Sequence, residues 1–301
     1  MNTTQHLDVF GIITNRIIEQ LETQFIPWQK PWSEGGHPQN LFSKRYYTGI
    51  NTWLLGSLGY AQNYFLTWNQ LKSVGASVKK GEKGTMIVFW KRLQADETMK
   101  DEEPQPAKSI LRYYYVFNVA QIDNLPEALT IPFPQGTFSP LSACDEIVER
   151  MPNCPIIKHE QQRAFYNPIM DYVNMPRQES FTTPESYYCA LFHELVHSTG
   201  HRSRLNRREI VEPNRFGSQP YSIEELTAEI GACYLNSVSG ILTAEFDNSV
   251  AYIQGWIKAL KNDKRMLVYA SGQAQRATDY ILNVHSYQDA AVQIAEEIET
   301  Q

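Results

Sequence analysis

Cysteine is scarce in this sequence, and it has no long apolar run. The four cysteines among 301 residues stand far apart and form no C-x-x-C pair, so we expect neither a disulfide framework nor a cysteine-based zinc knuckle. No stretch approaches the roughly 20 apolar residues that span a bilayer. Residues 1–10 lack the basic and apolar regions of a signal peptide. We therefore expect a cytoplasmic protein with reduced thiols and no membrane partner.

The composition is otherwise that of a globular protein, but its charge is unevenly distributed. Hydrophobic residues make up 42% and charged residues 20% of the chain, and the formal net charge is −6. Residues 1–92 contain ten basic and five acidic residues, whereas the rest contains 17 basic and 28 acidic residues. Five of the six tryptophans also fall in the basic part. This asymmetry indicates two halves with different partners.

The first half is predicted to mix helices and strands. Residues 6–24 carry apolar side chains at three- and four-residue spacing, which is typical of an amphipathic helix. Residues 67–75 form a second, short helix with Thr67 as its cap. Two β-prone runs, 86–90 and 113–122, flank a polar segment, so we expect an antiparallel pair joined by a loop.

A proline-rich segment marks the start of the second half. Four prolines between residues 126 and 140 favour a boundary there. We expect an α+β protein of two domains, at residues 1–128 and 139–301, with a linker at 129–138. Residues 164–173 suit a strand, and Pro168 within it favours the edge of a sheet. Helices are predicted at residues 140–151, 185–199, 223–238, 247–270 and 273–284.

A histidine pair with an adjacent glutamate is the most specific motif. His193 and His197 are four residues apart, so on an α-helix both imidazoles lie on one face and can bind one cation. Glu194 lies beside them, where its carboxylate can accept a proton from water that zinc has acidified. The alternative is a pair of unligated histidines, but apolar residues flank the motif, and burying unpaired polar groups is costly. The motif therefore predicts a zinc site with Glu194 as the catalytic base.

The sequence leaves two candidates for the third protein ligand. In the three-histidine arrangement the last histidine falls at position 203, which is Ser203 here. A carboxylate from a later helix is the remaining source. We favour Glu225, which can otherwise cap its helix with Ser222. Glu229 is the second choice, or the carboxylate that supports a ligating histidine. His201 is either a surface histidine or a group that contacts substrate.

Aromatic and basic residues gather in the first half in a pattern suited to single-stranded DNA. Bases stack on aromatic rings while cations contact phosphates, and each stacked base contributes about 1–3 kcal/mol. The candidate DNA-contacting residues are Trp28, Lys30, Trp32, Lys44, Arg45, Tyr46, Tyr47, Asn51, Trp68, Lys72, Lys79, Lys80 and Lys83. The lysines can instead belong to a solvated loop, and Asn51 can instead cap local structure. Trp53 and Trp90 have apolar neighbours, so we expect both in the core.

Several motifs resemble one known family. HELVHSTGHRSRL at 193–205 and EELTAE at 224–229 resemble the zincin-like metallopeptidase domain of ArdC-type antirestriction proteins. The first half resembles the ArdC N-terminal domain, which also occurs in TraC-type primases. The motifs that carry the rest of the resemblance are Pro27–Trp32, Tyr47–Asn51, Thr67–Leu71, Lys79–Thr85, Val116–Val119, Asp171–Pro176 and Trp256–Lys264.

The resemblance implies a plasmid or mobile-element protein that protects incoming conjugative DNA from restriction. It also implies an N-terminal domain that binds single-stranded DNA and a metallopeptidase fold whose third ligand is glutamate. The acidic insertion at residues 93–108 departs from the family, and we expect it to alter only a loop.

Three functional hypotheses follow. In the first, the protein binds single-stranded DNA and hydrolyses a protein or peptide that the sequence does not name, with Glu194 as general base. The apolar edge strand would align that peptide by main-chain pairing. In the second, it is a non-enzymatic DNA-binding protein whose metal is structural. A third, a nucleic-acid-processing enzyme, is disfavoured because no acidic cluster suits two-metal chemistry. Zinc is the expected ion, although imidazole and carboxylate ligands suit other divalent metals too.

Overall fold

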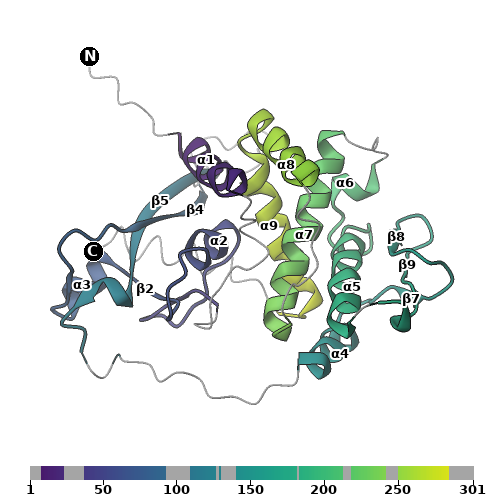
Figure 1. The fold of residues 1–301 in the computed structure, drawn as a ribbon, viewed down its shortest axis with the longest axis horizontal. Helices are drawn as coiled ribbons and strands as arrows, with labels where there is room; N and C mark the ends of the chain where they lie inside the picture. Colours follow the sequence, from purple (N-terminus) through teal and green to yellow (C-terminus); the bar gives the residue numbers. More distant parts are fainter. Residues whose placement is uncertain are drawn as a thin grey trace, which may run out of the picture.

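The computed structural model describes residues 8–23, 37–92, 109–126, 129, 140–181, 183–212, 218–241 and 250–284. Figure 1 shows strands β2, β4 and β5 at one side, the helices α5, α7, α8 and α9 in the middle, and the short strands β7–β9 at the other side. The mixture of helices and strands confirms the predicted α+β class.

The elements follow one another along the chain in an order that places most strands first. They are α1 (Val9–Glu22), β1 (Gln39–Asn40), α2 (Ile50–Gly56), β2 (Tyr64–Thr67), α3 (Trp68–Ser73), β3 (Ser77–Val78), β4 (Thr85–Arg92), β5 (Ser109–Asn118), η1 (Val119–Gln121), β6 (Ile122–Asp123), α4 (Pro140–Arg150), β7 (Ile156–Lys158), β8 (Phe165–Asn167), β9 (Tyr172–Asn174), η3 (Gln178–Ser180), α5 (Pro184–Thr199), α6 (Arg208–Val211), α7 (Gln219–Ser239), α8 (Val250–Asn262) and α9 (Met266–Ile281).

A four-stranded sheet, in the order β1-β2-β5-β4, organises the first half. β4 and β5 pair antiparallel from Thr85 opposite Val116 to Arg92 opposite Ser109, which confirms the pair predicted from the two β-prone runs. Their predicted connecting loop, 93–108, lies outside the described residues. The small sheet of β3 and β6 completes this half.

Helix α1 packs against helices of the second half. Its apolar face, with Leu21 at the centre, lies in one buried cluster with side chains of α2, α7, α8 and α9. Thr14 Oγ1 donates a hydrogen bond to Lys264 O at 2.8 Å. The Tyr234 hydroxyl of α7 donates to Gly49 O at 2.6 Å. The N-terminal and C-terminal parts of the chain therefore share a hydrophobic core.

Each half also has an apolar cluster of its own. Phe65 and Val116 belong to a cluster in the first half, and Phe192 and Leu235 belong to one that involves α5 and α7. The predicted linker at 129–138 lies outside the described residues apart from its first position. The division into two domains at that point stays a prediction.

A three-stranded sheet, in the order β7-β9-β8, lies beside α5. The single strand predicted at 164–173 is instead two strands, β8 and β9, joined by a turn. Pro168 lacks the N–H that would continue the strand, and Asp171 has a φ of 50°. β8 pairs with β9 alone among the described strands, so the predicted edge position is confirmed for β8, whereas β9 is the central strand between β7 and β8.

The last two helices have a different boundary from the predicted one. α8 ends at Asn262, and Asp263 forms the turn by accepting a hydrogen bond from Arg265 N at 2.9 Å. The predicted break at residues 271–272 lies inside α9, where Ser271 is buried.

The structure bears on two expectations about the cell environment. None of the described helices is both long and apolar enough to cross a membrane. The four cysteines, all of them among the described residues, are free thiols in this structure.

The shared core predicts that the two halves unfold together. Replacing Leu21 by alanine removes a fully buried side chain of α1 and should lower the free energy of unfolding by about 2–5 kcal/mol. Urea denaturation followed by tryptophan fluorescence and circular dichroism should give one transition at a lower midpoint. Ile12→Ala, on the exposed face of the same helix, is the control. Equal effects of the two substitutions would contradict the shared core.

Candidate metal centre

Helix α5 begins where the sequence predicts. Thr183 caps it, because its Oγ1 accepts a hydrogen bond from Ser186 N at 3.2 Å, and Pro184 is the first helical residue. The last helical residue is Thr199, followed by Gly200. Most of the helix from residue 191 onward is buried, so the histidine motif is held on a fixed element.

Helix α7 crosses α5 at a short distance. A Cβ atom added to Gly231 would lie 2.8 Å from Val196 Cγ2 and 2.9 Å from its Cγ1, closer than carbon atoms pack. Glycine is therefore needed at this position. The close crossing brings the N-terminal turns of α7 against the histidine face of α5.

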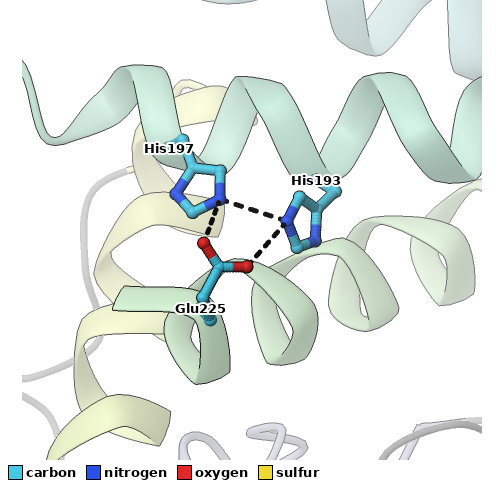
Figure 2. A group of neighbouring side chains, drawn as sticks. All are labelled: His193, His197 and Glu225. Atoms are coloured by element: carbon cyan, nitrogen blue, oxygen red, sulfur yellow. Dashed lines mark hydrogen bonds and ion pairs between the residues drawn. The ribbon is translucent and has the colours of Figure 1, made fainter. Parts of the chain in front are cut away.

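Two imidazoles and one carboxylate converge between these helices. His193 and His197 project from α5 toward Glu225 of α7, as Figure 2 shows. The two Nε2 atoms are 3.1 Å apart. Glu225 Oε2 is 3.7 Å from His193 Nε2, and Glu225 Oε1 is 3.8 Å from His197 Nε2. Among the described residues these three form the group whose ligand atoms all lie within 4.8 Å of one another.

The donor set fits a divalent metal ion. For zinc with bonds of about 2.0–2.1 Å, tetrahedral geometry separates the ligand atoms by about 3.3–3.4 Å. The separations of 3.1, 3.7 and 3.8 Å bracket that distance. Two neutral imidazoles and a carboxylate also leave a coordination position for water or substrate.

The charges around the triad favour a cation. Burial alone would lower the pKa of His193, but its hydrogen bond to Glu225 and the charges of Glu194, Glu225 and Glu229 raise it to about 9. Burial likewise acts to raise the pKa of Glu225, yet the hydrogen bond from His193 and the nearby His197 lower it overall. An ion bound here replaces the positive charge that these carboxylates otherwise draw onto His193.

A buried ion pair orients His197. Its Nδ1 lies 3.0 Å from Glu224 Oε1. An ionised carboxylate only accepts hydrogen bonds, so Nδ1 carries the proton and Nε2 presents its lone pair to the centre. Arg207 donates to Glu224 Oε2 from Nε at 3.0 Å and to Oε1 from Nη2 at 2.6 Å. Arg207 Nη2 also donates to Val196 O at 2.8 Å, which ties this pair to α5.

Sequence analysis missed Glu224 and Arg207. The only available signal was the adjacency of Glu224 to the preferred ligand, because Arg207 lies in a different segment and joins the site only in the folded chain. Glu229, the second choice for the ligand, is buried one turn beyond Glu225 and is absent from the metal-capable group. Its charge nevertheless acts on His193.

The triad opens onto a cleft of about 940 Å³. Glu194, the candidate base, lines this cleft together with Tyr221 and residues of the edge strand β8. Burial, followed by the nearby charge of Glu225, raises the pKa of Tyr221 to about 12, so its hydroxyl stays a hydrogen-bond donor at neutral pH. The centre is therefore reachable from solvent on the side of β8.

His201 also lines the cleft. Its Nδ1 accepts a hydrogen bond from Ser203 N at 3.2 Å and lies 3.8 Å from Asp171 Oδ2. Accepting at Nδ1 leaves Nε2 as the protonated nitrogen of the neutral ring. A contact of this ring with substrate stays a prediction.

The candidate DNA-contacting residues differ in their exposure to solvent. Trp68 is exposed, and Lys72 Nζ lies 5.8 Å from the centre of its ring. Lys44, Tyr46, Lys79, Lys80 and Lys83 are exposed and Arg45 is half-buried. Trp28, Lys30 and Trp32 lie outside the described residues.

Two of these candidates have side chains that are buried or hydrogen-bonded within the fold. Tyr47 is buried, and its hydroxyl accepts a hydrogen bond from Asn40 Nδ2 at 3.3 Å. Asn51 donates to Val88 O at 2.6 Å and accepts from Val88 N at 2.9 Å, so its amide is used by strand β4. The structure thus contradicts Tyr47 as an exposed stacking platform and commits the Asn51 side chain to the fold.

The core assignment of the tryptophans was correct only for Trp53. Trp53 is fully buried and stacks on Tyr234, with ring centres 4.7 Å apart. Trp90 is 46% exposed, and its ring centre lies 6.1 Å from that of Phe10 in α1. Tyr113 and Tyr115, which point to the same face from β5, are also exposed.

Two family profiles match the chain. The profile described as the N-terminal domain of anti-restriction factor ArdC matches residues 8–117, and the one described as a zincin-like metallopeptidase matches residues 145–273. With the convergent triad, these matches define an antirestriction-type protein in which a zincin-like metallopeptidase domain follows an ArdC N-terminal domain.

Known relatives agree with this class. The chain is 34% identical to a DNA primase TraC of Escherichia coli over 291 residues, which is 90% of this chain but only about a quarter (26%) of the primase. It is 30% identical to the uncharacterized protein y4eC of Sinorhizobium fredii, with 91% of both chains covered.

The solved structures of ArdC from plasmid R388 are similar over nearly the whole chain. The Mn(II)-bound form has 35% identity and a TM-score of 0.72, covering 92% of this chain and 98% of that one. The metal-free form has 34% identity and a TM-score of 0.71, covering 93% and 100%. The chain belongs to the ArdC antirestriction family. The manganese-bound relative and the zincin-like domain support a divalent metal ion at the triad.

The Glu224–Arg207 pair predicts a role in metal affinity. Glu224→Gln removes the carboxylate that fixes the His197 tautomer, and such losses outside the ligand set typically weaken metal binding about 10–100-fold. It also leaves the buried Arg207 without its counter-charge, which should lower the free energy of unfolding by up to about 3–5 kcal/mol. Competition with a chromophoric chelator and thermal unfolding measure the two effects. Glu146→Gln, which breaks an exposed pair with Arg150, should change neither; wild-type metal affinity in Glu224→Gln would refute this role.

Proposed function

We propose that this protein is an antirestriction factor that hydrolyses peptide bonds at a zinc centre and binds single-stranded DNA through its N-terminal half. The observation that carries the first activity is the convergence of His193, His197 and Glu225 on one cleft that Glu194 also lines. In this proposal Glu225, rather than Glu229, is the third ligand. The activity named for the plasmid R388 relative supports the antirestriction role.

Each of these residues has a separate role in the proposed hydrolysis. The two imidazoles and Glu225 would hold the ion, which would supply a Lewis acid able to polarise a carbonyl and acidify water. Glu194 accepts the proton of the attacking water and passes it to the leaving amine. Glu224 keeps the His197 ring in its ligating orientation. The edge of β8 with which no described strand pairs offers main-chain groups to an extended peptide.

An aromatic row on the N-terminal sheet supports the second activity. Tyr113, Tyr115 and Phe117 alternate along one face of β5, and Trp68 packs against Phe117 with ring centres 5.8 Å apart. A Cβ atom added to Gly84 would lie 3.0 Å from Phe117 Cζ, so the lysine-rich turn at 79–83 borders the same row. Rings for bases and cations for phosphates are thus adjacent. We assign Trp90, Tyr113 and Tyr115 to this surface in place of Tyr47 and Asn51.

The second hypothesis, a non-enzymatic DNA-binding protein with a structural metal, predicts a different number of protein ligands. A structural zinc site is closed by four protein ligands, whereas this group offers three and opens onto a cleft. This geometry favours the hydrolytic proposal.

Removal of the candidate base tests hydrolysis directly. In Glu194→Gln the amide cannot accept a proton, so peptide hydrolysis by the zinc-loaded protein should fall by about 10²–10⁴-fold. Metal content and DNA affinity should stay unchanged. Glu185→Gln, in the first turn of the same helix and outside the cleft lining, is the control. If Glu194→Gln protects transferred DNA as well as the wild type does, antirestriction does not depend on hydrolysis and the second hypothesis gains.

Substitution in the aromatic row tests DNA binding. Tyr115→Ala should weaken binding of a fluorescent oligothymidine to the full chain by about 5–150-fold, the equivalent of about 1–3 kcal/mol for one stacked base. Titrations at several salt concentrations should show a smaller salt dependence in Lys83→Ala, which removes one phosphate contact. Tyr269→Ala, an exposed tyrosine of α9, is the control. Unchanged affinity in Tyr115→Ala would remove the row from the DNA surface.

A further inference from the structure

Two large apolar side chains are displayed to solvent in a turn beside the metal cleft. Ile169 is 92% exposed and Met170 is 70% exposed. Both lie in the turn between β8 and β9, and Ile169 lines the cleft with Pro168. Ile210 and Val211 of α6 also line it. The cleft that contains the triad therefore has an apolar part.

The turn that carries these side chains is fixed by its own hydrogen bonds. Asn167 Oδ1 accepts from both Ile169 N and Met170 N at 3.0 Å. The turn ends at Asp171, whose carboxylate accepts a hydrogen bond from the Tyr166 hydroxyl at 2.8 Å. The exposed pair is thus held by specific contacts at both ends.

A buried arginine ties the same turn to the metal-binding helix. The Arg204 side chain is 1% exposed and forms a two-pronged ion pair with Asp171. Its Nε also donates to Ser198 O at 2.7 Å, one residue after His197 in α5. Nη1 donates to Asn153 O at 3.1 Å. The distance between the apolar turn and the metal centre is therefore set by the fold.

Because they are exposed, these two apolar side chains contribute little burial free energy to the fold. Their burial by a ligand is favourable in proportion to the area covered. An extended peptide that pairs with the free edge of β8 sends alternate side chains to opposite faces. Peptide side chains on one of these faces would contact the apolar turn, and the peptide backbone would lie near the triad.

We propose that Ile169 and Met170 select the substrate: an extended, unfolded segment with a bulky aliphatic or aromatic residue beside the scissile bond. This inference rests on the proposed peptidase function, and it names the class of peptide that function would take. The pair acts through contact with the substrate side chain, so its removal should change preference among peptides and leave the metal centre intact.

The test uses the full chain loaded with zinc and a set of unstructured fluorogenic peptides that differ only at one position, occupied by Leu, Phe, Ala or Ser. The wild type should cleave the Leu and Phe peptides with a kcat/KM about tenfold or more above that for Ala and Ser. Ile169→Ser and Met170→Ser should each reduce that preference severalfold. Ile156→Ser is the matched control, because Ile156 is equally apolar, 69% exposed and on β7 outside the cleft lining.

A second measurement separates this inference from the peptidase proposal. Binding of the same peptides to Glu194→Gln, with and without Ile169→Ser, does not require hydrolysis. If the wild type cleaves none of them but the apolar preference appears in binding and is lost with Ile169→Ser, the peptidase proposal fails and the apolar site stands. If peptides are cleaved or bound without preference for Leu and Phe, or with a preference that Ile169→Ser leaves intact, the inference is overturned.

Discussion

The close crossing of α5 and α7 is the constraint on which the candidate site depends. Two histidines four residues apart define only one side of a metal site, and the other side must come from a second element. Gly231 lets α7 approach α5 closely, because the side chain of Val196 occupies the space that a Cβ atom at position 231 would need. Because the helices are in contact there, Glu225 reaches the two imidazoles from α7 (Figure 2). A wider separation would leave the histidine pair as an incomplete ligand set.

The buried Arg207–Glu224 pair orients one of the two histidines at this crossing. Such pairs cost desolvation free energy that their attraction barely offsets, so their contribution to stability alone is a weak reason for their presence. Here the carboxylate has a second partner in His197 Nδ1, and the arginine is also bonded to the backbone of α5. The pair therefore fixes both the tautomer and the ring position of His197, a candidate ligand.

The two candidate surfaces belong to one packed body in the described part of the chain. α1 and α2 share their apolar cluster with α7, α8 and α9, and α7 also carries Glu225. Figure 1 shows the strands β4 and β5 on one side of helices α7 and α9 and helix α5 on the other, so this shared core connects the N-terminal sheet to the metal centre. In the proposed function, a peptide bound at the cleft lies at a set distance from DNA bound to the sheet.

The sequence by itself determined the features that local chemistry controls. The spacing of His193 and His197 placed both on one helix face, and Thr183 and Pro184 fixed where that helix begins. Two β-prone runs on either side of a polar segment predicted the pairing of β4 with β5. Only the tertiary structure placed Glu225, and not Glu229, in the metal-capable group. It also left Trp90 exposed and Tyr47 buried, and it brought Glu224 and Arg207 together. Each of these depends on which surface of an element meets another, and residues distant in the chain set that packing. Local spacing carries no information about it.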